Sequence, residues 1–280
     1  MEQVRDSVQN VAKGDLVIAP FLYSDGTCPN CRIGITSACV SGGVWGVNGI
    51  DGGQGEAVRV PLADGTLVKV PGSSHSDKTL ASLLTLSNVM CTGHHAVKSA
   101  GVKKGDTVAV VGDGAVGLCA IIAAKRLGAQ RIIALSRNPA RQKLAREFGA
   151  TDIVAERGGE ANESVLGLTD RIGVDAALEC VGTNEAVQTA LDIARPGSIV
   201  GYVGVPHSVE IPVENIFYRN VGVHGGPAPA RAYIPELLDD ILKGHINPGR
   251  IFDFSVDLSG ITEAYAAMDE RRAIKSLVKL

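Results

Sequence analysis

Aromatic residues are scarce in this chain, where phenylalanine, tyrosine and tryptophan together make up 4% of 280 residues. Proteins that hold single-stranded nucleic acid stack its bases on aromatic side chains, so the scarcity argues against such a surface. A surplus of positive charge is lacking too, because the formal net charge is -3. Neither nucleic acid nor an anionic membrane surface is therefore expected as a partner.

Long apolar runs are also missing. No stretch reaches the roughly 18 apolar residues that a membrane-spanning helix needs, and the segment Met1–Asn10 is mostly polar, unlike a secretory signal. We therefore expect a cytoplasmic protein without a membrane partner. Apolar residues still make up 45% of the chain and charged residues 20%, a balance typical of a globular protein with a large core.

From Gly105 onward, short apolar runs alternate with helical patterns. We expect strands at Thr107–Val111, Ile132–Leu135, Asp152–Ala155, Asp175–Glu179 and Ser198–Val203. The intervening helices include Ala115–Leu127 and Ala140–Phe148, each followed by a glycine that ends it. Strands that alternate with helices predict βαβ units and a parallel sheet.

The two ends of the chain differ from this middle part. The first hundred residues are rich in glycine and proline with short apolar runs, which predicts an irregular, mostly antiparallel β region with strands at Leu16–Pro20, Ala57–Val60 and Leu67–Val70. After Gly226 the pattern predicts helices at Pro235–Leu242 and Ile261–Met268 and a final strand at Ser276–Leu280.

A glycine-rich run, V-G-D-G-A-V-G-L from Val111 to Leu118, contains the pattern G-x-G-x-x-G. Its place between a predicted strand and a predicted helix is the context that dinucleotide binding requires. Gly112 permits a tight turn, Gly114 lets the backbone approach a pyrophosphate, and Gly117 allows close packing of helix on strand. The helix N-terminus then offers N–H groups to the phosphates.

The end of the next strand indicates which cofactor binds. An acidic residue about twenty positions after the glycines would hold the ribose hydroxyls of NAD, but that place is taken by Ser136. Arg137 follows, and Arg141 lies one helical turn further on. Because a guanidinium can bind a phosphate through two parallel bonds, we expect NADP rather than NAD.

Three of the six cysteines cluster near the start of the chain, in the segment Asp25–Cys39, which we call the cysteine lobe. Asp25, Cys28, Cys31 and Cys39 have the spacing D-x2-C-x2-C-x7-C. Thiolates and carboxylates are zinc ligands, and this spacing suits a tetrahedral structural zinc. The alternative is three reduced cysteines in a loop without metal. Cys119 and Cys180 are interpreted as small residues of the core, and Cys91 as a residue of the site wall or of the core.

These motifs together resemble the zinc-dependent alcohol dehydrogenases of the medium-chain dehydrogenase/reductase superfamily. The resemblance also includes K-G-D-L-V at Lys13–Val17, G-G-Q-G-E at Gly52–Glu56, T-G-H-H-A-V at Thr92–Val97 and L-E-C-V-G at Leu178–Gly182. It implies an α/β fold in which a Rossmann domain, a doubly wound parallel sheet at residues 91–226, is inserted in a partial GroES-like catalytic domain at residues 1–90 and 227–280. It further implies hydride transfer between an alcohol or aldehyde and the cofactor, in a homodimer or homotetramer.

The resemblance also implies roles for individual residues. Besides Asp25 and the three lobe cysteines as ligands of the structural zinc, it implies cofactor contacts by Gly112, Gly114, Val116, Gly117, Ser136, Arg137, Val181, Gly182, Val203, Gly204 and Lys275 and near His224–Gly225. Arg141 joins these contacts through its place after the strand end. Thr92 and Asn88 fall at catalytic positions, Asn88 at that of a catalytic-zinc ligand. His94 and His95 are expected to open the helix after a turn at Thr92–Gly93.

Two departures from the family pattern bear on activity. The other catalytic-zinc ligands of the family lie in a region before Met1, and an amide such as that of Asn88 binds zinc poorly. We therefore expect this chain to bind NADP but to turn over alcohols weakly. Two alternatives stay open: a catalytically inactive cofactor-binding protein, and a zinc-free quinone or enone reductase of the same superfamily, which would usually lack the cysteine lobe.

Overall fold

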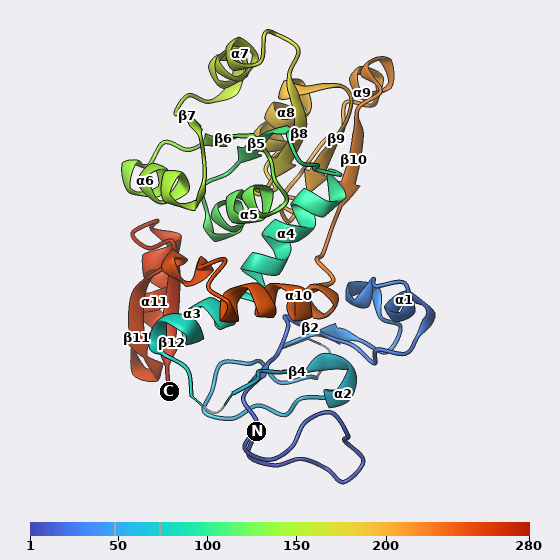
Figure 1. The fold of residues 1–280 in the computed structure, drawn as a ribbon, viewed down its shortest axis with the longest axis vertical. Coiled ribbons are helices and arrows are strands. Elements are labelled where there is room, and N and C mark those ends of the chain that lie inside the picture. The colour runs from blue at the N-terminus through green and yellow to red at the C-terminus, as the bar shows by residue number, and fades with distance from the viewer. Residues whose placement is uncertain (48, 73) are drawn as a thin grey trace. The chain divides into compact units, whose positions relative to one another are not determined.

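The computed structural model describes residues 1–47, 49–72 and 74–280. Figure 1 shows the ribbon with its elements labelled. The chain forms two compact units, one contiguous and one built from both chain ends. The contiguous unit is Thr92–Ala228, and the other combines Met1–Cys91 with Pro229–Leu280.

The contiguous unit is built on a six-stranded sheet with the order β10-β9-β8-β5-β6-β7. All five strand pairings in it are parallel. The strands are β5 (Thr107–Val111), β6 (Arg131–Leu135), β7 (Asp152–Val154), β8 (Val174–Glu179), β9 (Ala194–Tyr202) and β10 (Gly222–Gly225). Since β5 lies between β6 and β8, the order of the strands reverses there, which makes the fold doubly wound.

Helices connect these strands. Between successive strands lie α5 (Ala115–Arg126), α6 (Pro139–Phe148), α7 (Gly158–Leu168), α8 (Asn184–Ile193) and α9 (Val213–Arg219). Helix α4 (Val89–Ser99) begins just before the unit and precedes β5. Helix α5 ends at Arg126, two positions before Gly128, whose φ of +87° is the left-handed conformation that glycine adopts readily. The α/β fold with a Rossmann sheet, and the predicted strands and helices of this unit, are thereby confirmed.

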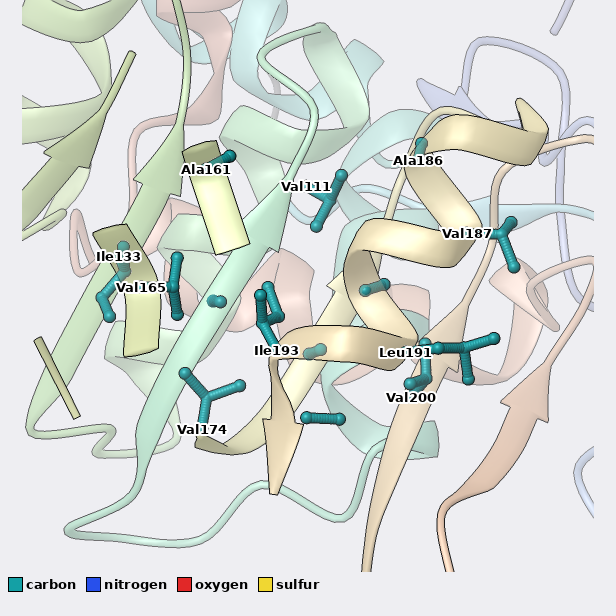
Figure 2. Close-up of a cluster of buried hydrophobic side chains, with 14 of the residues drawn as sticks. Val111, Ile133, Ala161, Val165, Val174, Ala186, Val187, Leu191, Ile193 and Val200 are labelled. Atoms are coloured by element: carbon teal, nitrogen blue, oxygen red, sulfur yellow. The ribbon is translucent and has the colours of Figure 1, made fainter. Parts of the chain in front are cut away.

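One face of this sheet is covered by α7 and α8 through a continuous apolar cluster (Figure 2). Val165 of α7 and Leu191 of α8 are completely buried against strand residues such as Ile133 and Ala177. Fully burying one valine, leucine or isoleucine stabilises a fold by roughly 1.5–3 kcal/mol. This cluster therefore holds the strand ends, where the candidate site lies, in fixed positions.

The Thr92–Gly93 pair does not form the turn that the sequence predicted. Helix α4 already begins at Val89 and continues through both residues to Ser99. A Cβ atom on Gly93 would lie 2.5 Å from the backbone nitrogen of Ala120 in α5. The glycine is therefore explained by close packing of two helices, and His94 and His95 lie inside α4 rather than at its start.

The other unit has short strands joined by loops. Strands β1 (Val17–Ile18) and β4 (Val68–Lys69) pair antiparallel, as do β2 (Leu22–Tyr23) and β3 (Gly43–Val44). Near the C-terminus, β11 (Phe252–Asp257) and β12 (Lys275–Lys279) pair in parallel. The helices are α1 (Pro29–Arg32), α2 (Ala63–Thr66), α3 (Asp77–Thr85), α10 (Ala230–Leu242) and α11 (Ile261–Asp269), with 3-10 turns η1 (Thr36–Ala38), η2 (Pro248–Ile251) and η3 (Leu258–Gly260).

Two predictions for this unit are wrong. Residues 57–60 form no strand, because Ala57, Val58 and Arg59 are all exposed and have no apolar face to bury. Helix α10 begins at Ala230 rather than at Pro235, so that the proline lies inside the helix. There its ring nitrogen has no hydrogen to donate to the carbonyl four residues earlier, a loss that the helix tolerates.

Among the described residues, none of the helices combines the length and the apolar character needed to cross a lipid bilayer.

Candidate cofactor and metal sites

The glycine-rich run from Val111 to Leu118, called the glycine loop below, lies at the point where the strand order reverses. Register aligns Val111 of β5 with Leu135 of β6 and with Glu179 of β8, so the residues that follow these strands meet at one edge of the sheet. In open α/β sheets, ligands bind at the carboxyl ends of the strands beside such a switch point. The edge formed by these strand ends is therefore the candidate cofactor site.

Gly112 and Gly117 are required by the shape of this loop. Gly112 has a φ of +115°, and a Cβ atom there would lie 2.7 Å from Cγ2 of Val181. A Cβ atom on Gly117 would overlap the carbonyl oxygen of Gly112. These two glycines thus permit the tight turn and the close packing of α5 on β5 that the sequence predicted for them.

Gly114 is different, because open space lies where its Cβ atom would be. Apart from Gly114 itself and its two neighbours in the chain, no described residue has an atom within 4 Å of that position. Gly114 is the N-cap residue of α5 and, as a glycine, has no side chain to cap that helix end. The N–H groups of the first turn, around Val116, receive no cap from it and can bind an anion.

Three of the predicted cofactor residues, Ser136, Arg137 and Arg141, follow the end of β6. Ser136 is buried, with 4% of its surface exposed, whereas Arg137 beside it is exposed. Arg141, in the first turn of α6, does not extend into solvent. Its Nη1 atom lies 3.3 Å from Oδ1 of Asp113, in an ion pair whose side chains are 10% and 22% exposed.

The opposite wall of the site is the turn after β8. The Oε1 atom of Glu179 accepts hydrogen bonds from the N–H groups of Val181 and Gly182, each at 2.8 Å. Glu179 is completely buried, and this burial raises the pKa of its carboxyl. Gly182 has a φ of +90°. A Cβ atom on Gly204, which follows β9 and Val203, would meet this same turn.

The cysteine lobe brings the four predicted ligands together. One ligand atom each from Asp25, Cys28, Cys31 and Cys39 lies within 4.8 Å of the other three. Among the described residues, it is the one such group of three or more histidine, cysteine or acidic side chains. The Sγ atom of Cys28 accepts from the N–H of Cys31, so this cysteine also caps helix α1.

The charges in the lobe favour a bound cation. Hydrogen bonds from the N–H groups of Cys28 and Thr27, at 2.9 and 2.7 Å, hold the pKa of Asp25 well below its ordinary value. N–H groups of Cys31 and Val40 lower the pKa of Cys28. Burial instead raises the pKa of Cys31 to about 12, because a lone thiolate is costly there. A divalent metal would offset that cost, so the donor set fits zinc.

The remaining predicted residues belong to α4, to the residue before it and to β12. Asn88 precedes α4 and lines an apolar cavity of the two-segment unit, together with Trp45 and Leu84. Thr92 is buried in α4. Cys91 is completely buried, as a core residue should be, and its thiol donates to the carbonyl of Leu86 at 3.2 Å. Lys275 opens β12, and burial lowers its pKa.

Two residues of the site were missed from the sequence. Asp113 occupies a variable position of the glycine pattern, and Glu179 was interpreted as a strand residue. Their acidic side chains, one inside a glycine loop and one ending an apolar strand, are the signal that could have identified them. A carboxylate at either place must be held by specific partners, since it is too costly to bury alone.

Two family descriptions match the chain. "Zinc-binding dehydrogenase" matches residues 115–243, and "Alcohol dehydrogenase GroES-like domain" matches residues 1–72. The first covers helix α5, which follows the glycine loop, and most of the parallel sheet. The second covers the cysteine lobe.

Individual relatives agree. The chain is 32% identical to zinc-type alcohol dehydrogenase B of Aspergillus flavus over 99% of its own length and 66% of that protein. It is 30% identical to the NADP-dependent isopropanol dehydrogenase of Thermoanaerobacter brockii over 89% of its length and 72% of that protein. The solved structure of the alcohol dehydrogenase TADH from Thermus sp. ATN1 superposes with a TM-score of 0.89 at 32% identity, covering 99% of this chain and 81% of that one.

The fold and the glycine loop thus define a dinucleotide-binding oxidoreductase of the α/β class. Within that class, the chain belongs to the zinc-dependent alcohol dehydrogenases of the medium-chain dehydrogenase/reductase superfamily. It spans about two thirds of the length of the first curated relatives that it matches.

Proposed function

We propose that the protein transfers hydride between a small alcohol or aldehyde and a nicotinamide cofactor, with NADP(H) preferred over NAD(H). The observation that carries the proposal is the glycine loop, where Gly114 leaves open space at the start of α5. A pyrophosphate at that position would accept hydrogen bonds from backbone N–H groups and would face the positive end of the helix dipole.

The preference for NADP rests on the end of β6. Ser136 carries no charge that would repel a 2′-phosphate, and the exposed guanidinium of Arg137 is available to bind one. A relative with NADP in its name, the isopropanol dehydrogenase of Thermoanaerobacter brockii, supports the same choice. The turn at Val181–Gly182 and the residues Val203 and Gly204 would form the wall beside the cofactor.

The proposal includes a structural zinc in the cysteine lobe, held by Asp25, Cys28, Cys31 and Cys39. Such an ion would fix the loops of the lobe, because these loops contain little regular structure of their own. A catalytic zinc is a different matter. The neutral amide of Asn88 does not suit that role.

Cofactor binding and turnover test the proposal separately. Titration of the unmodified chain with NADP+ and NAD+ in a calorimeter measures binding, and the absorbance of reduced nicotinamide measures hydride transfer from a panel of alcohols. Binding of NADP+ with measurable turnover is the expected result. Absence of binding by either dinucleotide would overturn the proposal, whereas binding without turnover would favour the second candidate, an inactive cofactor-binding protein, which Asn88 supports.

The proposal also places the protein in the cytoplasm as a homodimer or homotetramer. A reducing compartment would keep the lobe thiols able to bind metal. For assembly, the support is helix α9, where Phe217 and Tyr218 are 72% and 75% exposed. Large exposed aromatic side chains are enriched in protein interfaces. Light scattering of the purified protein should give twice or four times the mass of one chain, and a monomer would contradict this part.

A further inference from the structure

Asp113, Ser136 and Arg141 form a connected polar group beside the glycine loop. The hydroxyl of Ser136 donates to Oδ2 of Asp113 at 2.8 Å. The Nη1 atom of Arg141 lies 3.3 Å from Oδ1 of the same carboxylate and 3.4 Å from the carbonyl oxygen of Asp113. Asp113 thus holds both residues, one through each carboxylate oxygen.

The hydrogen bond of Ser136 determines what its hydroxyl can offer a ligand. A serine hydroxyl has one proton and two lone pairs. Since Asp113 accepts that proton, Ser136 presents lone pairs to the site. Lone pairs can accept a bond from a ribose 2′-hydroxyl, but a 2′-phosphate has only acceptor oxygens to offer.

The ion pair with Asp113 likewise limits how strongly Arg141 can attract a 2′-phosphate. Its guanidinium faces a carboxylate that is partly shielded from water, with only 10% of the Arg141 side chain exposed. Much of its positive charge is therefore balanced within the protein. A 2′-phosphate at the end of β6 would meet the negative charge of Asp113 without the full charge of Arg141 to compensate it.

From these contacts we propose that Asp113 determines cofactor specificity by limiting the preference for NADP over NAD. In many dinucleotide-binding sheets an acidic residue at the end of the second strand binds the ribose hydroxyls. Here the carboxylate reaches the same region from the glycine loop, because the ends of β5 and β6 are neighbours. The inference rests on the proposed function, since it assumes that a nicotinamide dinucleotide binds at this edge.

The test is the variant Asp113→Asn, which keeps the shape of the side chain and removes its charge. An asparagine carbonyl can still accept from Ser136 or Arg141, so the local geometry is retained. The carboxylate charge beside Arg141 is removed, and the repulsion of a phosphate is relieved. NADP+ should bind the variant about tenfold more tightly than it binds the unmodified chain, whereas NAD+ should bind equally or more weakly.

Fragments isolate the contribution of the ribose. Adenosine 2′,5′-bisphosphate and adenosine 5′-monophosphate differ in the 2′-phosphate alone, and the ratio of their dissociation constants should shift with that of the dinucleotides. Asp113→Ser provides a second uncharged variant for the same titrations. The matched control is Asp152→Asn, which removes the carboxylate from a different ion pair, Arg131–Asp152 at 2.9 Å, at the start of β6 and β7. This control should leave the ratio unchanged.

Three results would overturn the inference. An unchanged ratio in Asp113→Asn and Asp113→Ser would show that the carboxylate has no influence on the 2′-phosphate. Equal weakening of the binding of NADP+ and NAD+ in these variants would show that Asp113 has a merely structural role. Failure of the unmodified chain to bind any of the dinucleotides or fragments would overturn the proposed function as well, and so can be told apart from the first two results.

Discussion

The Sγ atoms of Cys28 and Cys39 lie 3.9 Å apart, although eleven positions separate the two cysteines in the chain. Two zinc–sulfur bonds of about 2.3 Å at a tetrahedral angle place their sulfur atoms roughly 3.8 Å apart. This pair of sulfur atoms therefore has the separation that two ligands of a tetrahedral zinc would have.

We expect about one zinc ion per chain, as a single tetrahedral site requires. Elemental analysis of purified protein measures this. In Cys28→Ser the zinc should be lost, because a hydroxyl is a far weaker ligand than a thiolate. Cys119→Ala is the control, since Cys119 is buried in α5, which belongs to the other unit, and it should keep its zinc. Native protein free of metal, with thiols that titrate freely, would contradict the assignment.

Gly114 and Gly117 should respond differently to the same substitution. Gly117→Ala places a methyl group into the carbonyl oxygen of Gly112, so the free energy of unfolding should fall by about 1–3 kcal/mol. Gly114→Ala meets open space and should change stability by less than about 1 kcal/mol. Its methyl group would nevertheless occupy the place of the pyrophosphate, so cofactor binding should weaken. Thermal unfolding and calorimetric titration measure the two effects, and equal losses of stability would be inconsistent with this geometry.

Arg137→Ala should weaken the binding of NADP+ and leave that of NAD+ nearly unchanged. A charge-assisted bond to a phosphate is worth roughly 1.5–3 kcal/mol, which corresponds to a tenfold or greater rise in the dissociation constant. Arg146→Ala is a suitable control, because Arg146 lies in the last turn of α6. A variant that binds both cofactors as the unmodified chain does would exclude Arg137 from the site.

Glu179 should make stability depend on pH. Burial raises the pKa of its carboxyl above the ordinary value of 4.5, an effect that hydrogen bonds from Gly182 and Val181 only partly offset. The folded state therefore holds the proton more tightly than the unfolded state. The resulting stabilisation is present below the ordinary pKa and is lost as pH rises through the raised one.

Urea unfolding of the unmodified chain and of Glu179→Gln, at several pH values from about 4 upward, tests this. The free energy of unfolding of the glutamine variant should rise relative to that of the unmodified chain as pH increases. Curves that stay parallel across this range would show that Glu179 has an ordinary pKa.

The parallel sheet could be predicted from the sequence because its strands are short apolar runs with glycines at their ends. Thr107–Val111 was predicted with the bounds that the structure has. The N-terminal β-rich segment was harder to predict, since β1 to β4 are two residues long and apolar character alone does not mark them. Val58 and Val60 satisfy an alternating pattern but belong to no strand, and Val58 is exposed while Val60 is half-buried.

Side-chain partners at the candidate site were the least accessible to sequence reasoning. The spacing of the lobe cysteines predicted a cluster because the four ligands are close along the chain. Asp113 and Arg141 are far apart in sequence and meet only because β5 and β6 are neighbours. The pattern therefore assigned Arg141 to the cofactor, although the structure pairs its guanidinium with an acidic residue that the pattern had left unassigned.

The division of one unit between the two chain ends affects how the protein forms during synthesis. The segment Thr92–Ala228 is continuous, so it can fold as soon as it has left the ribosome. The other unit has to wait for Pro229–Leu280, because that stretch supplies part of its structure. Until then, the N-terminal segment remains incomplete on the nascent chain. Early binding of metal by its cysteine lobe would order the N-terminal segment during that delay.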